Sequence, residues 1–130
     1  MIFRGKFWFL SNMYSHNITY KGHTYACAES AFQAQKDATQ AFQFEKLDGF
    51  AAKKLGKRVN LRPDWDQVKL QIMKEILKVK FSDHDLMNQL KAVTEPIVEE
   101  NTWRNTYWGV CNGYGQNHLG KLLTEIKNNY

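Results

Sequence analysis

The sequence predicts one α+β domain that is rich in helices and contains a few short β-strands. Apolar residues recur at helical spacing along several segments, most clearly over residues 63–77. One pair of aromatic and β-branched segments flanks a glycine turn, as a β-hairpin does. Strand and helix patterns do not alternate in the βαβ order that a parallel sheet requires. The 130 residues are enough to bury a core without disulfides.

The N-terminal part is expected to form a strand followed by a hairpin. Residues Phe3–Leu10 are rich in aromatic side chains, which favour β-strands. Ile18–Tyr20 and Thr24–Tyr25 then flank Lys21-Gly22-His23. The glycine of this turn can adopt the positive φ that a tight turn requires.

Three helices are expected over the middle of the chain. The first begins near Ala28 and ends around Thr39. The second spans about Asp48–Leu55, with Gly56 as the C′ residue that follows a helix C-terminus. The third is the longest, and Pro63 is expected at its first position because proline is favoured there.

The C-terminal part is expected to contain two more helices and two short strands. Ser82–Asp85 reads as a variant of the capping box before an amphipathic helix. The strands are expected at Ile97–Glu99 and Tyr107–Cys111. A glycine-rich turn then leads to the last helix, for which Asn117 is the expected N-cap.

The net charge favours an anionic partner such as a phosphate, a nucleotide or a nucleic acid. The formal charge is +5 and the isoelectric point is about 9.2. The basic residues of the stretch from Lys53 to Arg62 are a candidate anion site. They would equally suit the solvated face of a helix, where lysine is common.

The composition excludes several other classes of protein. A mean hydropathy of −0.57 with charged residues throughout excludes a membrane span. The start of the sequence lacks the apolar region of a secretory signal, so a cytoplasmic location is expected. Two distant cysteines and four histidines without ligand spacing predict neither a disulfide nor a metal site.

The helix expected near residue 28 carries a stripe of polar side chains. Glu29, Gln33 and Lys36 recur at i, i+4 and i+7, so they share one face, with Phe32 beside them. A carboxylate, an amide and an amine next to an aromatic ring are typical of a functional site. An ordinary exposed helix surface would use the same residue types, because all three are good helix formers.

Five segments occur in the order of one known family. They are Phe9-Leu10-Ser11-Asn12, Ala28–Lys36, Leu55–Arg58 with Arg62–Asp66, Trp108-Gly109, and Gly115–Leu123. They span nearly the whole chain, which therefore resembles the NADAR, or YbiA-like, family. The resemblance implies a single domain of this family over residues 1–130 and cleavage of N-glycosidic bonds. It implies as substrate either ADP-ribosylated guanine, free or in nucleic acid, or a ribosylated pyrimidine intermediate of riboflavin synthesis.

The resemblance turns the polar stripe into a candidate catalytic site. It implies that the Lys36 amine attacks C1′ and passes through a Schiff base with the opened sugar. Glu29 would stabilise the positive charge that develops on the ribose, and would activate water or relay a proton. The alternatives are that Lys36 binds a substrate phosphate and that Glu29 only positions Lys36. Phe32 would provide an apolar wall, and Gln33 a substrate contact.

The remaining candidate substrate-binding residues lie outside this helix: Arg4, Gly5, Asn12, Trp65, Asn105, Trp108 and Asn117. Arg4 and Gly5 are candidates for a phosphate. Asn12 can hydrogen-bond ribose or phosphate, or simply form a turn. The two tryptophans can stack a base, a contact worth about 1–3 kcal/mol, or belong to the core. Asn117 precedes a helix N-terminus that can bind phosphate.

Asn105 departs from the family pattern, in which an acidic residue generally precedes the Trp-Gly pair. An amide donates and accepts hydrogen bonds but cannot act as a carboxylate base. If the acid is essential, this protein would be slow, inactive or a pure ADP-ribose-binding module. If the acid only orients a neighbouring group, Asn105 suffices. A nucleic-acid-binding domain is a third class, disfavoured because the basic residues form no continuous arm.

No metal, redox group or other cofactor is implied by the resemblance, since water and two side chains can perform the hydrolysis. The partner implied is the ribosylated nucleotide itself, and the sequence identifies no protein partner.

Overall fold

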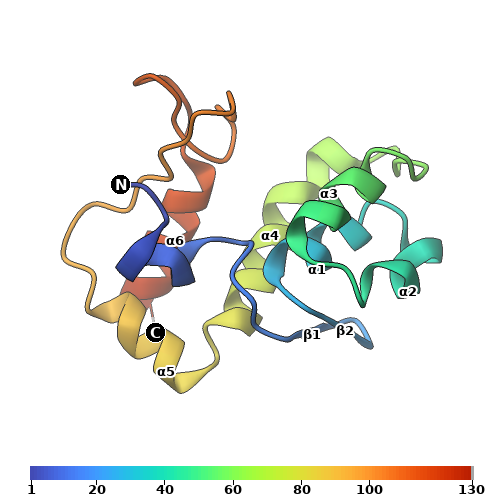
Figure 1. Cartoon of the computed structure of the whole chain (residues 1–130), viewed down its shortest axis with the longest axis horizontal. Helices are drawn as coiled ribbons and strands as arrows, with labels where there is room; N and C mark the ends of the chain where they lie inside the picture. The colour runs from blue at the N-terminus through green and yellow to red at the C-terminus, as the bar shows by residue number, and fades with distance from the viewer. Residues whose placement is uncertain (130) are drawn as a thin grey trace. The chain divides into compact units, whose positions relative to one another are not determined.

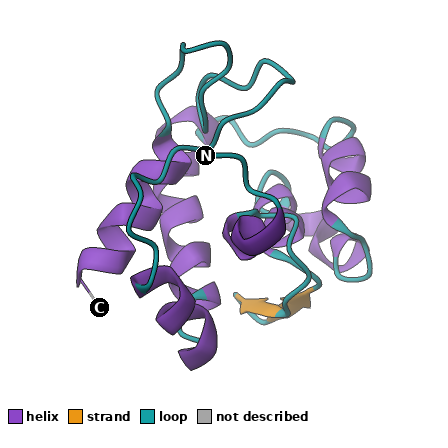
Figure 2. Cartoon of the chain, turned by 60° about the vertical axis from the view of Figure 1, so that its left-hand side comes forward, coloured by secondary structure: helices purple, strands orange, loops and turns teal. Residues whose placement is uncertain are grey.

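The structure, a computed structural model, describes residues 1–129 and forms two compact units. The central unit comprises residues 12–80, and the terminal unit comprises residues 1–11 together with the chain from residue 81 onward. Helices predominate, and the two strands of one small hairpin form a two-stranded sheet (Figure 2). This confirms the predicted helix-rich α+β class. The prediction of a single domain stays a prediction. Within the described residues, no helix has the length and apolar character needed to cross a membrane.

The central unit is built around a short helix that follows a hairpin (Figure 1). Its elements are β1 (Ile18–Tyr20), β2 (His23–Tyr25), α1 (Ala28–Ala34), the 3-10 turn η2 (Ala38–Gln40), α2 (Ala41–Phe44), α3 (Gly49–Gly56) and α4 (Trp65–Lys80). The two strands are antiparallel, with Ile18 opposite Tyr25 and Tyr20 opposite His23, as expected. Helix α1 packs against α3, α4, α2 and the hairpin, so it forms the centre of this unit.

Helix α1 is shorter than the sequence pattern predicted. Its last residue is Ala34, and the backbone turns at Gln35, whose N–H bonds to the carbonyls of Gln33 and Phe32. The Asp37 side chain then accepts a hydrogen bond of 3.1 Å from the Thr39 N–H and starts η2. The predicted continuation to Thr39 is wrong because this local side-chain bond replaces the next helical turn.

Helix α3 begins as expected but ends differently. The Asp48 carboxylate accepts a 2.8 Å hydrogen bond from the Ala51 N–H, as an N-cap does. Gly56 is a buried residue of the helix and Lys57 is the C-cap, so the prediction of Gly56 as C′ is wrong. Pro63 lies two residues before the start of α4, and therefore precedes the helix instead of occupying its first position.

The terminal unit contains the 3-10 helix η1 (Gly5–Leu10), α5 (His84–Lys91) and α6 (His118–Asn129), and α5 packs against α6. The strand predicted at Phe3–Leu10 is wrong. Gly5 has a φ of +57°, and the Ser11 N–H bonds to the Trp8 carbonyl at 3.0 Å. The tight coil buries Phe9, whose ring meets Phe81 edge-on with centroids 6.4 Å apart.

Helix α5 begins in the predicted segment, but its N-cap is Asp83 and not Ser82, the first residue of the predicted capping box. The Asp83 carboxylate accepts a 2.9 Å hydrogen bond from the Leu86 N–H, three residues along. This confirms the predicted helix start.

The strands predicted at Ile97–Glu99 and Tyr107–Cys111 do not form. The described chain has only isolated bridges there, a parallel one between Glu100 and Val110 and an antiparallel one between Cys111 and Tyr114. Asparagine side chains take up backbone groups that a ladder would use, as the contacts of Asn117 illustrate.

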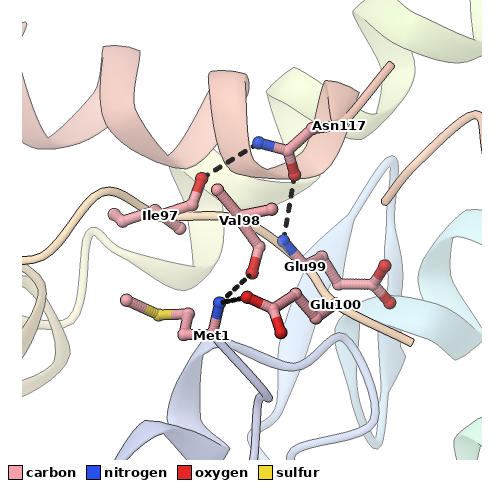
Figure 3. Close-up of polar contacts among 6 residues, drawn as sticks. All are labelled: Met1, Ile97, Val98, Glu99, Glu100 and Asn117. Atoms are coloured by element: carbon pink, nitrogen blue, oxygen red, sulfur yellow. Dashed lines mark hydrogen bonds and ion pairs between the residues drawn. The ribbon is translucent and has the colours of Figure 1, made fainter. Parts of the chain in front are cut away.

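The side chain of Asn117 holds the backbone of residues 97–99 (Figure 3). Its Oδ1 accepts a 2.9 Å hydrogen bond from the Glu99 N–H, and its Nδ2 donates a 3.0 Å bond to the Ile97 carbonyl. The backbone carbonyl of Asn117 accepts the Lys121 N–H, as that of an N-cap residue does, so Asn117 lies at the predicted N-cap position of α6. Its side chain binds the 97–99 segment in place of the first turn of the helix. The Met1 amino group donates to the Val98 carbonyl at 3.1 Å and pairs with Glu100.

Lys80, the last residue of α4, is fully buried. Its ammonium lies 5.5 Å from the ring centroid of Tyr14. Burial disfavours the charged form and lowers the pKa of Lys80 to about 7, against a smaller opposing effect from Cys27. The folded protein therefore holds this amine neutral at mildly alkaline pH.

This lysine predicts how stability depends on pH. Between pH 7 and 10.5 the unfolded chain keeps a proton on Lys80 that the folded chain has released, so stability rises with pH in this window. The limiting slope is about 1.4 kcal/mol per pH unit. Urea unfolding at pH 7.5 and 9.5 should show a gain of about 1–2 kcal/mol that Lys80→Met lacks. Parallel pH profiles for the two proteins would contradict the assignment.

Candidate functional site

The predicted site residues divide between the two units. The central unit holds the two predicted catalytic residues and four of the predicted substrate contacts: Asn12, Glu29, Phe32, Gln33, Lys36 and Trp65. The terminal unit holds the others: Arg4, Gly5, Asn105, Trp108 and Asn117. Each group is described within its own unit.

The polar stripe of α1 is not an ordinary exposed surface. Every residue of α1 is buried except Glu29, which is half-buried, and Lys36 just beyond the helix is half-buried as well. Gln33 Nε2 donates a 3.2 Å hydrogen bond to Glu29 Oε2 one turn earlier. The carboxylate is thus oriented by its own helix.

The environment of Glu29 favours its neutral form. Loss of hydration raises the pKa of Glu29, opposed by the charge of Lys53, the hydrogen bond from Gln33 and the charge of Lys36, in that order. The backbone N–H of Glu29 donates a 2.9 Å hydrogen bond to the Asn12 carbonyl. The backbone of Asn12 therefore satisfies one of the free N–H groups at the start of α1.

Lys36 lies where α1 has ended and the chain turns. Its amine is 5.9 Å from the ring centroid of Trp65, and its carbonyl accepts a 3.0 Å hydrogen bond from the Arg62 N–H. Loss of hydration lowers the pKa of Lys36, Glu29 opposes this, and Lys57, Lys53 and Lys69 add to it. A lysine with a lowered pKa is a stronger nucleophile near neutral pH.

Phe32 and Trp65 form the apolar support of this lysine. Their ring centroids are 4.9 Å apart, and both side chains are buried. Trp65 is therefore a core residue that also lies beside the Lys36 amine, and stacking of a base on it stays a prediction.

Two buried amide oxygens lie at this site without a hydrogen-bond partner among the described residues: Gln33 Oε1 and Asn12 Oδ1. A Cβ added at Gly56 would lie 2.0 Å from Gln33 Oε1, so the amide lies against the backbone of α3. The Asn12 amide donates to the sulfur of Met73 at 3.7 Å. Both oxygens are buried acceptors with unused hydrogen-bonding capacity, and a substrate contact for Asn12 and Gln33 stays a prediction.

In the terminal unit, Asn105 acts as a hydrogen-bond acceptor. Its Oδ1 accepts a 2.9 Å bond from the Trp108 N–H, and its backbone is held on both sides by the buried side chain of Asn101. A carboxylate at this position would accept the same bond. An amide and a carboxylate can therefore hold the loop before Trp108-Gly109 in the same way.

The other predicted residues of this unit have no shared ligand geometry. Arg4 and Gly5 are exposed at the start of η1. Trp108 is half-buried and meets Tyr107 edge-on, with ring centroids 4.8 Å apart. The side chain of Asn117 holds the 97–99 segment, as described above.

Two residues outside the predicted set have the burial and neighbours of functional groups. Lys53 of α3 was part of the basic stretch but was not singled out, although Gly49, Lys53 and Gly56 share helical spacing. Glu99 is a half-buried carboxylate that accepts a 3.0 Å hydrogen bond from Asn101 Nδ2. A Cβ at Gly109 would lie 1.6 Å from Glu99 Oε2, which explains the glycine of the Trp-Gly pair.

Metal coordination receives no support from the described residues. No group of three or more histidine, cysteine, aspartate or glutamate side chains among them is placed to hold an ion. Cys27 and Cys111 are free and buried.

Comparisons with known proteins agree on one family. The model of the NADAR domain matches residues 3–129. N-glycosidase YbiA of Shigella flexneri serotype 5b (strain 8401) is 34% identical over 124 residues, covering 90% of this chain and 78% of the relative. N-glycosidase Npun_R5314 of Nostoc punctiforme is 34% identical over 127 residues, covering 90% and 81%. The NMR structure of the E. coli protein YbiA superimposes with a TM-score of 0.84 at 31% identity, covering 98% and 82%.

The contact between Gly56 and Gln33 predicts an interaction that a double-mutant cycle can measure. Gly56→Ala places a methyl group on Gln33 Oε1 and displaces the amide, at an expected cost of about 1–2 kcal/mol. In a Gln33→Ala background the same change should be neutral or stabilising by up to about 1 kcal/mol, because alanine is the better helix former. Equal effects in both backgrounds, measured by urea unfolding, would show that Gly56 does not position Gln33.

The acceptor role of Asn105 predicts which substitutions the loop tolerates. Asn105→Asp keeps the oxygen that binds the Trp108 N–H, so stability should change by less than about 0.5 kcal/mol. Asn105→Ala removes it and should cost about 1–2 kcal/mol. Thermal unfolding of the two variants checks this, and a strongly destabilised aspartate variant would contradict it.

Proposed function

This chain belongs to the NADAR family, and we propose that, as an N-glycosidase, it cleaves the bond between ribose and base in ADP-ribosylated guanine or in a ribosylated pyrimidine intermediate of riboflavin synthesis. The observation that supports this is a half-buried carboxylate in α1 together with a half-buried amine just beyond the end of that helix, whose pKa is lowered. The proposal includes the cytoplasmic location expected from the sequence.

The reaction requires one proton and one electron pair to move to the base. The neutral Lys36 amine attacks C1′ while the C1′–N bond breaks and its electrons pass to the base nitrogen. Positive charge develops on the ribose, and the Glu29 carboxylate stabilises it. The proton lost by the attacking amine passes to Glu29, directly or through one water, and then to the departing base.

The sugar then leaves the enzyme by hydrolysis. The ribose ring opens to form a Schiff base between C1′ and the Lys36 nitrogen. Water adds to this carbon, the C–N bond breaks, and the free sugar and amine are restored. The raised pKa of Glu29 suits this relay, because it makes the carboxylate a better proton acceptor than an exposed glutamate.

A binding module for ADP-ribose without turnover is the second candidate. Asn105, where the family generally has an acid, favours it. The bond from the Trp108 N–H to Asn105 Oδ1 favours turnover instead, since an amide fills this acceptor role as well as a carboxylate does.

A borohydride trap tests the proposed chemistry. The protein is incubated with ADP-ribosylated guanosine and reductant, and an adduct is sought by intact mass. The native protein should form it, and Lys36→Met should not, with turnover reduced 100-fold or more. Lys54→Met, which changes an exposed lysine, is the matched control. Base release without an adduct would indicate direct attack by water, and neither release nor adduct would favour the binding module.

The pKa shifts also predict the pH dependence of the reaction. Lys36 must be neutral and Glu29 ionised at the start, so the rate should rise with pH and then level off. The pKa of Lys36 is lowered from 10.5, so the increase in rate that follows deprotonation of Lys36 should occur below pH 10.5. Single-turnover rates over pH 5–9.5 measure it, and a rate that falls across the whole range would contradict these roles.

A further inference from the structure

The face of α3 that meets α1 is defined by two glycines. A Cβ at Gly49 would lie 3.2 Å from Glu29 Cβ and 2.1 Å from Met13 Sδ, and one at Gly56 would lie 2.0 Å from Gln33 Oε1. The glycines are seven residues apart, which is two helical turns. The side of α3 that carries both therefore runs along Glu29 and Gln33.

Lys53 lies on this same face of α3. It follows Gly49 by four residues and precedes Gly56 by three, and residues at these spacings are neighbours on a helix surface. Lys53 is half-buried, whereas the next residue, Lys54, is exposed. The helix thus presents one lysine to the α1 stripe and a chemically identical one to solvent.

The charges at this interface do not balance. Lys53 is the strongest charged influence on Glu29, and Lys53 and Lys57 both act on Lys36. Lys53 and Lys36 therefore both act on one carboxylate, and Lys57 adds positive charge near Lys36. A fourth nearby lysine, Lys69, has its own partner, because its amine lies 3.3 Å from Asp66.

Lys53 also lacks an ion pair of its own among the described residues, since no carboxylate oxygen there lies within 4.0 Å of its amine. A half-buried ammonium carries three donors that water satisfies only in part. A phosphate group brings several acceptor oxygens and up to two negative charges, which matches the excess of positive charge.

We propose that Lys53 binds a phosphate of the substrate beside the reacting ribose, and so selects phosphorylated ribosides over their unphosphorylated counterparts. This inference rests on the proposed function and adds to it a residue that determines specificity. The chemistry recognised is a phosphate monoester or a pyrophosphate, which both candidate substrates carry.

Binding of ADP-ribose, measured by calorimetry, tests the proposal without requiring turnover. Lys53→Gln should weaken the affinity tenfold or more, and the matched Lys54→Gln should change it less than twofold. Lys53→Arg keeps the charge and should stay within threefold of the native protein. Circular dichroism of each variant establishes that it is folded, which is expected for changes at partly exposed positions.

Three results would overturn the proposal. The first is an affinity of Lys53→Gln within twofold of the native value. The second is an equal loss in Lys54→Gln, which would reveal only general charge attraction. The third is an unchanged affinity with a shifted pH–rate profile, which would mean that Lys53 acts only on Glu29 or Lys36.

The binding and trapping experiments fail independently. If ADP-ribosylated guanosine gives no base release and no adduct, yet Lys53→Gln loses ADP-ribose affinity, the proposed reaction is wrong and the phosphate contact stands. If the native protein turns over and Lys53→Gln binds normally, the phosphate contact is wrong and the reaction stands.

Discussion

The close approach of α3 to α1 is the constraint on which the candidate site depends. Gly49 and Gly56 add no side chain of their own, so at these two positions the backbone of α3 lies close to the side chains of Glu29 and Gln33. Larger residues would separate the helices by the thickness of a side chain. The same approach brings Lys53 to the carboxylate, and so creates the electrostatic environment of the stripe.

Partial burial then gives the stripe its chemistry. Lys36 and Glu29 each lose part of their hydration, and this shifts both pKa values toward the neutral forms. Their mutual attraction opposes both shifts, but other lysines add a further bias at Lys36. A carboxyl group with a raised pKa and an amine with a lowered pKa are suited to acid–base and nucleophilic roles.

The terminal unit uses a different principle, in which amide side chains replace strand pairing. Asn101, Asn105 and Asn117 together bind backbone groups of the segment from Ile97 to Trp108. Such bonds hold an irregular loop in one conformation without a sheet. The bond observed for Asn105 needs only an acceptor oxygen, which an amide and a carboxylate both have.

The sequence by itself determined the helix-rich class, the hairpin, the start of α5 and the family, because these depend on local patterns and on motif order. It also indicated the α1 stripe, through the spacing of Glu29, Gln33 and Lys36. Only the tertiary structure decided that Phe3–Leu10 coils and that Gly56 is a packing residue. It alone singled out Lys53 among the lysines of its stretch. These outcomes depend on contacts between segments distant in the chain, and burial, which shifts a pKa, is a property of those contacts.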